Sequence, residues 1–283
     1  MKPFRLGHLP NTGKHPDAHE LLALRVATSG LPALSAPDLR SFDGPIEDQG
    51  QAGSCGAFAF GRQLAIFFRA NLMTKNWIFA DPLLMYAQAR LQEYAGQPLA
   101  SIPPLTDSGV QPAHLLKAAQ ALGFMVWNDD PDFTYPRDTG TLNDPNAMLA
   151  LVTRSILPEA AMRAFDQSKL TYGLYQGDPT KVADWIEQCL LHRMPVTFGM
   201  QVDQAYQDNT GELVTNIDLA NSLGGHDQCS LAFDAKGNLI VDGSWGLVAG
   251  NAGVFTIARG VINNPAICSD FQIVNAAPLP EGT

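Results

Sequence analysis

The chain changes its periodicity near residue 195, and this change constrains the fold more than any other feature. Before it, apolar residues recur at helical spacing from Gly56 to Met73, and further helices are predicted at 113–122 and 179–193. After it come short β-rich runs separated by Gly, Asn and Asp, at 195–202, 229–233, 238–242, 253–258 and 271–275. A helical half followed by a strand-rich half predicts an α+β fold with a cleft between the halves.

Composition narrows the class of protein. A chain of 283 residues that is 46% hydrophobic can bury a substantial core in one large domain or two modest ones. Its net charge of -10, without a cluster of Lys and Arg, argues against nucleic acid and anionic membranes as partners. The N-terminus has no apolar signal segment, and no apolar run reaches the ~20 residues that cross a bilayer. We therefore expect a cytoplasmic protein, or one packaged from the cytoplasm into a virus particle.

We expect no metal site and no cofactor. The four cysteines form no C-x-x-C pair, which fits a reduced compartment. His15 and His19 stand four residues apart but lack a third ligand. The acidic loop at 128–132 lacks the spacing of an EF-hand and is interpreted as a solvated turn.

Cys55 is the candidate nucleophile. It begins the first predicted helix, where the helix dipole and unpaired N–H groups favour a thiolate and predict a lowered pKa. Gln49 stands six residues earlier, and Gly50 and Gly53 permit a tight path that folds Gln49 back over Cys55. We expect the Gln49 amide and the Cys55 backbone N–H to stabilise an oxyanion.

His226 is the candidate acid and base. It follows Gly224-Gly225 and precedes the strand-like run at 229–233. A histidine at the mouth of a strand can face a helix N-terminus across a cleft. Cysteine hydrolases require such an imidazole to hold and return the proton of the thiol.

With these residues, the chain resembles papain-like cysteine peptidases of the bacterial, archaeal and viral type that lacks a long inhibitory pro-segment. Residues 45–55 match the family's Pro-Val-x-x-Gln-Gly-x-x-Gly-Ser-Cys, and Gly225-His226 matches its Gly-His before a strand. Residues 243–246, Gly-Ser-Trp-Gly, match its Asn-Ser-Trp-Gly. Weaker matches follow in family order, at 38–40, 107–109, 195–199, Gly250 and Gly253.

The resemblance implies a two-lobed fold, a helical left lobe and an antiparallel β right lobe with the active-site cleft between them. The expected divisions are an N-terminal extension at 1–30 and a peptidase domain at 31–283, with lobes at about 45–190 and 191–278. The resemblance also implies an endopeptidase that acts on peptides or proteins through a Cys55 acyl-enzyme. Its cleft would include Gly53, Ser54, Gly225 and Trp245.

Several positions depart from the family pattern, three of them at the expected active site. Gly243 replaces the asparagine that orients the histidine, so orientation of His226 falls to Asp242, to Asp227, to water, or to nothing. Gly56 and Ala249 replace aromatic residues that would enclose the site. A weakened peptidase is therefore one interpretation. The alternative is a catalytically impaired fold that serves as a structural or binding component of a homo-oligomer or larger assembly, for example a viral particle.

Overall fold

The structure, a computed structural model, describes residues 6–71, 73–75, 77–98, 101–103, 105–122 and 170–276. Helices dominate its first part: α1 (Ala18–Thr28), η1 (Arg40–Phe42), α2 (Cys55–Ala70), α3 (Pro82–Gln92) and α4 (Pro112–Leu122). The second part adds η5 (Pro179–Lys181), α7 (Val182–Leu191), α8 (Gln204–Gln207), η6 (Leu219–Asn221) and α9 (Arg259–Ile262). The acidic loop at 128–132 lies outside the described residues.

The strands form one seven-stranded sheet in the order β1-β7-β2-β4-β5-β6-β3. Its pairs are antiparallel except β3–β6, which is parallel. The strands are β1 (Thr171–Leu174), β2 (Thr197–Val202), β3 (Leu213–Val214), β4 (Gly224–Phe233), β5 (Leu239–Asp242), β6 (Val254–Ile257) and β7 (Cys268–Asn275).

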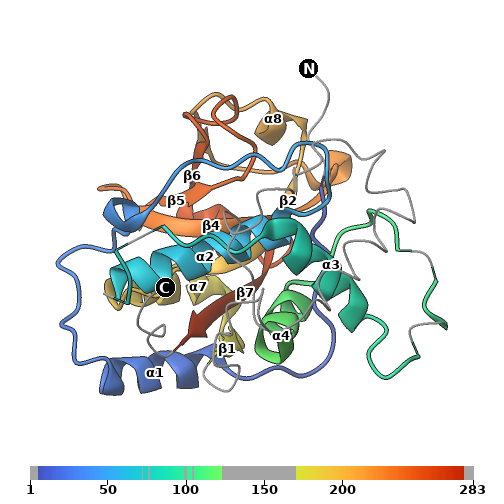
Figure 1. Ribbon diagram of the computed structural model, residues 1–283. Helices are drawn as coiled ribbons and strands as arrows, with labels where there is room; N and C mark the ends of the chain where they lie inside the picture. The colour runs from blue at the N-terminus through green and yellow to red at the C-terminus, as the bar shows by residue number, and fades with distance from the viewer. Residues whose placement is uncertain are drawn as a thin grey trace.

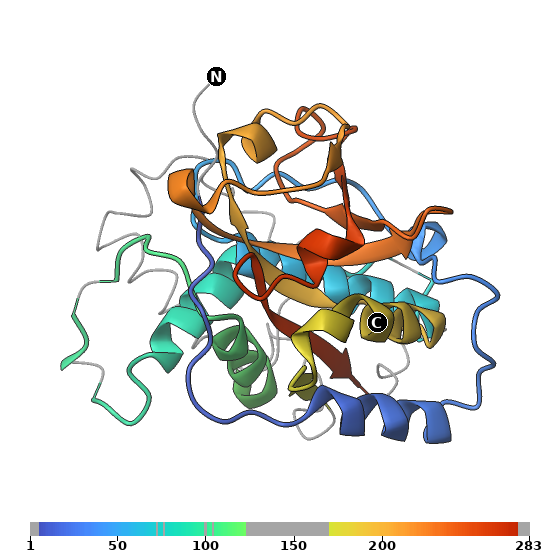
Figure 2. The ribbon, with the colours of Figure 1, turned by 180° about the vertical axis from the view of Figure 1, so that it is seen from behind.

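Helix α2 lies at the centre of the molecule, between the sheet and the pair α3 and α4 (Figure 1). It is buried on nearly all sides, and its buried apolar residues include Phe58, Phe60, Phe67 and Phe68. Seen from behind, α7 covers the lower part of the sheet (Figure 2). This arrangement sets the N-terminus of α2 against the ends of β2 and β4.

The α+β fold class is confirmed, and the helices and strands expected from the sequence all form. The structure adds the helices α1 and α3, the strands β1 and β3, and the short helical turns η1, α8, η6 and α9. β1 falls within the range expected for the helical lobe, yet it pairs with β7 in the sheet, Thr171 opposite Asn275. Gly173 explains how α1 docks there, since a Cβ at this glycine would lie 2.6 Å from the Cα of Ala18. None of the described helices is long and apolar enough to cross a membrane.

Candidate active site

The loop before α2 is anchored by a buried carboxylate. The backbone N–H of Gly53 donates to both oxygens of Asp107, at 2.9 and 3.1 Å. The hydroxyl of Tyr86 on α3 donates to the same carboxylate at 2.9 Å and accepts the N–H of Gly109. Asp107 thus fixes the path by which the chain enters Ser54, the N-cap of α2. The sequence indicated Asp107 only as part of a weak match.

Gln49 joins this loop to the segment that follows β5. Its Nε2 donates to the carbonyl oxygen of Ala52 at 2.7 Å, and its Oε1 accepts the hydroxyl of Ser244 at 2.8 Å. Its backbone N–H also donates to the Ser244 carbonyl at 3.0 Å. The side chain is fully buried. Gln49 therefore lies where the helical part meets the sheet, beside Trp245.

Cys55 is the first residue of α2 and is fully buried. Its Sγ lies 3.7 Å from Oδ2 of Asp227 on β4. Burial raises the pKa of the thiol well above its ordinary value, and the charge of Asp227 adds to this, while backbone hydrogen bonds from Asp227 and Gly7 oppose it. The lowered pKa expected for the Cys55 thiol is wrong for this state, because desolvation by burial outweighs the backbone hydrogen bonds that favour the thiolate.

His226 is held by the main chain and by an aromatic ring. Its Nε2 lies 2.7 Å from the carbonyl oxygen of Gly243, and its ring stacks on Trp245 with centroids 4.1 Å apart. Burial lowers its pKa to about 3; the hydrogen bond to Gly243 opposes this shift, and the charge of His8 adds to it. The imidazole is therefore neutral at pH 7. Because a carbonyl only accepts, Nε2 carries the proton.

Because Nε2 of His226 carries the proton, Nδ1 is the nitrogen with the free lone pair and can accept a proton. Nδ1 of His226 is buried and has no hydrogen-bond partner among the described residues. The peptide that links His226 to Asp227 lies against Cys55, since the backbone of Asp227 hydrogen-bonds to the thiol. Within the described part of the chain, no hydrogen bond joins His226 to Cys55 directly.

Comparison with known proteins reveals the same architecture elsewhere. No protein-family model and no curated protein sequence matches the chain. Among solved structures, the cysteine protease xylellain from Xylella fastidiosa matches over 98% of both chains, with a TM-score of 0.71 and 19% identity. The fold is that of the papain-like cysteine proteases.

Two further structures agree with this fold. Bromelain from Ananas comosus, solved with the E64 inhibitor, matches 85% of this chain and 98% of its own, with a TM-score of 0.56 and 14% identity. Digestive procathepsin L 3 of Tenebrio molitor matches 91% and 78%, with a TM-score of 0.58 and 17% identity. The expected two-lobed papain-like architecture is therefore confirmed.

A segment near the N-terminus lies between the helical part of the chain and the sheet, against Cys55. The N–H of His8 donates to the carbonyl of Gly225 at 3.0 Å. On the other side, Val110 donates to the carbonyl of Gly7 at 2.8 Å and accepts the N–H of Leu9 at 3.1 Å. Gly7 packs so closely that a Cβ there would lie 2.0 Å from the carbonyl oxygen of Gly53. Residues 7–9 thus bridge both lobes and cover Cys55.

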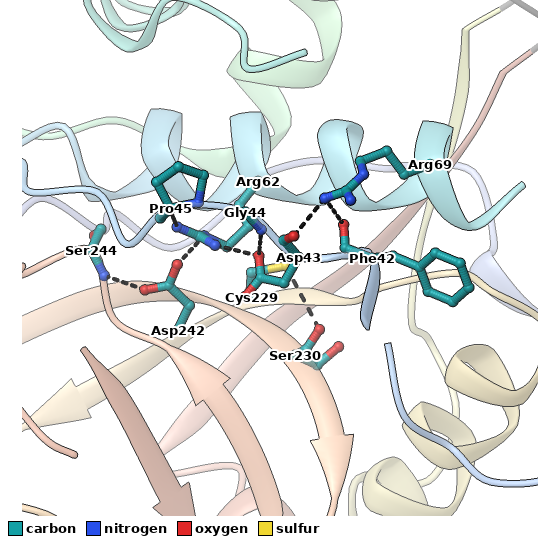
Figure 3. A network of polar contacts seen from close by, with 10 residues as sticks. All are labelled: Phe42, Asp43, Gly44, Pro45, Arg62, Arg69, Cys229, Ser230, Asp242 and Ser244. Atoms are coloured by element: carbon teal, nitrogen blue, oxygen red, sulfur yellow. Dashed lines mark hydrogen bonds and ion pairs between the residues drawn. The ribbon is translucent and has the colours of Figure 1, made fainter. Parts of the chain in front are cut away.

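Asp242, a candidate for orienting the imidazole, contacts other groups. One carboxylate oxygen accepts the N–H of Ser244 at 3.0 Å, and the other forms an ion pair with Arg62. Figure 3 shows Arg62 reaching from α2 between Asp242 and Asp43. Asp242 therefore neutralises a buried guanidinium, and the contact that orients His226 comes from Gly243.

The glycines that depart from the family pattern have packing reasons. A Cβ at Gly243 would lie 2.6 Å from Cε2 of Phe255, so the ring of Phe255 takes the space of an asparagine side chain. A Cβ at Gly56 would meet Oδ2 of Asp227 and Cδ1 of Leu115, both at 3.0 Å. Ala249 is buried in the core. The described residues gather no group of three or more metal-ligating side chains.

Proposed function

We propose that the chain is a cysteine peptidase and that the form with residues 7–9 over Cys55 is its closed, latent state. Cys55 is the nucleophile, His226 the acid and base, and Gln49 with the Cys55 backbone N–H stabilises the oxyanion. The observation that carries the proposal is the contact of His226 Nε2 with the carbonyl oxygen of Gly243, from which the tautomer of the imidazole follows. Because Gly243 engages Nε2–H, the lone pair of Nδ1 is available to take the thiol proton, and Trp245 holds the ring in place.

The reaction then follows from these groups. Nδ1 takes the proton of Cys55, and the thiolate attacks the carbonyl carbon of the peptide bond. The oxyanion that forms is held by N–H donors, and the imidazolium returns its proton to the leaving amine. Water, deprotonated by Nδ1, hydrolyses the thioester and restores the thiol. Protein or peptide substrates are expected.

The closed state keeps both groups uncharged. A buried thiol with a raised pKa and a buried imidazole with a lowered pKa leave the proton on sulfur. Release of residues 7–9 would admit water to the cleft, and hydration favours the charged thiolate and imidazolium. Activity therefore requires that this segment leaves.

The closed cleft also supports the second interpretation, in which the fold is retained as a binding or structural component. In that case residues 7–9 would be a permanent part of the core rather than a removable cover. The reactivity of Cys55 separates the two functions.

The test is alkylation by an E64-type epoxide at neutral pH, followed by peptide mass mapping. We expect Cys55 to be modified slowly in the full chain and faster in His8→Ala, which loosens the segment. Cys55→Ala should abolish the modification, and Cys268→Ala, which removes another buried thiol, should not change it. In His8→Ala, labelling of Cys55 no faster than that of Cys189 or Cys268 in the unfolded chain would contradict the peptidase function.

A further inference from the structure

His8 shows how the cleft holds a side chain. The residue is 6% exposed, and its ring lies between two carboxylates. Nδ1 is 2.9 Å from Oδ1 of Asp227, and Nε2 is 3.2 Å from Oδ2 of Asp270. Asp227 also lies 3.7 Å from Sγ of Cys55. A side chain bound in this way is therefore held directly beside the candidate nucleophile.

The backbone contacts around His8 do not depend on its side chain. The backbone of Val110 hydrogen-bonds to Gly7 and Leu9, and the carbonyl of Gly225 accepts the N–H of His8. An extended peptide that adds to the edge of a strand makes the same kind of bonds. Any extended peptide offers the same main-chain donors and acceptors. A substrate that replaces residues 7–9 can make these bonds and place one side chain where His8 lies.

Two glycines create the space for that side chain. A Cβ at Gly199 on β2 would lie 2.1 Å from Cε1 of His8, and a Cβ at Gly225 would lie 2.8 Å from its Cδ2. The backbone of Gly199 and Gly225 thus lines the space around the His8 ring, and the carboxylates of Asp227 and Asp270 lie at its two nitrogens. The space therefore accommodates the imidazole of His8, and the charge of the carboxylates selects the kind of side chain that is accepted.

The carboxylates favour a cation. Burial alone would lower the pKa of His8, yet Asp227 and Asp270 raise it to about 10, so the bound ring is an imidazolium at neutral pH. Asp270 otherwise accepts from Ser269 Oγ and from the N–H of Asn11, which belongs to the same N-terminal segment. When the segment leaves, the two carboxylates lose their counter-charge, which is costly in a partly desolvated site.

We propose that Asp227 and Asp270 form a subsite that binds a positively charged side chain, Arg, Lys or His, of a peptide substrate. The inference rests on the proposed function, since that peptide is the substrate of Cys55. Arginine fits best because its planar guanidinium can donate to both carboxylates at once. The subsite makes basic peptides the preferred substrates and acidic ones the poorest.

The experiment compares peptides that differ at one residue, Arg, Lys, Leu or Glu, scanned over the positions on each side of the cleaved bond. The enzyme is the full chain with His8→Ala. At one position we expect kcat/KM for Arg to exceed that for Leu by about 10- to 100-fold, as charge-assisted hydrogen bonds provide. Asp270→Asn should reduce this ratio about tenfold, while Asp184→Asn, an exposed carboxylate on α7, should preserve it. A preference for Leu, or an unchanged ratio in Asp270→Asn, overturns the subsite.

A binding measurement separates failure of the subsite from failure of the peptidase function. Peptides that copy residues 6–12, with Arg, Leu or Glu in place of His8, are titrated by calorimetry into the full chain carrying Cys55→Ala and His8→Ala. Tighter binding of the Arg peptide, by about tenfold, supports the subsite even if Cys55 proves unreactive. Equal binding of the three peptides, or binding of none, overturns it.

If Asp270→Asn does not fold, two variants of His8 itself test the subsite in the closed protein. His8→Arg keeps a cation between the carboxylates, whereas His8→Leu removes it. We expect His8→Arg to melt close to the parent chain and His8→Leu to melt at a lower temperature. Equal melting temperatures for the two variants would contradict a cation-selective subsite.

Discussion

Nε2 of His226 lies 2.7 Å from the carbonyl oxygen of Gly243, so the main chain provides the hydrogen bond for which Asp242, Asp227 and water were the candidates. The ring of Trp245 covers the imidazole, and the ring of Phe255 fills the space beside Gly243. Absence of an asparagine at position 243 therefore does not leave His226 without an orienting partner.

Restoring the asparagine should not improve the site. Gly243→Asn places a Cβ 2.6 Å from Phe255, so we expect a loss of about 1–3 kcal/mol in the free energy of unfolding, as for other overpacked cores. Alkylation of Cys55 should not accelerate. Urea unfolding provides the measurement, with Gly260→Ala as control because nothing lies within 4 Å of a Cβ there. If Gly243→Asn were more stable and its Cys55 reacted faster, the ring of Phe255 would have moved to admit the new side chain. The asparagine would then orient His226 better than the Gly243 carbonyl does.

Arg62 should be essential for stability. It is 2% exposed and pairs with Asp242 and Asp43, so Arg62→Met leaves Asp242 as a buried, uncompensated carboxylate (Figure 3). We expect a loss of about 3–5 kcal/mol in the free energy of unfolding. Arg40→Met, which breaks the exposed pair with Asp38, should cost about 0–1 kcal/mol. Similar losses in the two variants would contradict this account, and adding Asp242→Asn to Arg62→Met should recover part of the stability.

Alkaline pH should open the cleft. The pKa of His8 is raised from 6.5 to about 10, so its contribution to closure is complete below pH 6.5 and is lost as pH rises through about 10. Alkylation of Cys55 measured from pH 7 to 11 in the parent chain and in His8→Gln separates this effect from ionisation of the thiol. We expect His8→Gln to react faster near pH 7 and the two rates to converge above pH 10. A constant ratio would show that the charge of His8 does not hold the segment.

Acid should destabilise the protein through His226. Its pKa is lowered from 6.5 to about 3, so the unfolded chain binds this proton more readily than the folded one. The stabilisation from a neutral His226 is complete above pH 6.5 and is lost progressively as pH falls towards 3. Urea unfolding from pH 7 to 4 should show a shallower decline in His226→Gln than in the parent chain. Parallel declines would mean that the imidazole becomes hydrated and protonated without unfolding.

Local sequence patterns were sufficient for much of the fold. The apolar spacing of 56–73 predicted α2, and the Gly-rich approach to Cys55 predicted a tight loop in front of it. Strands β2, β4, β5, β6 and β7 were predicted because their residues alternate or favour extended backbone between turn residues. β1 escaped prediction because its pairing with β7 joins residues 104 positions apart, Thr171 and Asn275.

The sequence by itself determined the fold class, the position of Cys55 at a helix start, and the residues from which a hydrolytic site would be built. Only the tertiary structure decided their state. His8 and Asp227 are 219 positions apart, yet their contact covers the thiol. The carbonyl of Gly243 replaces a missing side chain, and every residue has such a carbonyl, so no residue type identifies it. The physical reason is the same in each case. Burial and contacts between distant parts of the chain determine the protonation of Cys55 and His226 and the access of substrate to them, and no short stretch of sequence contains this information.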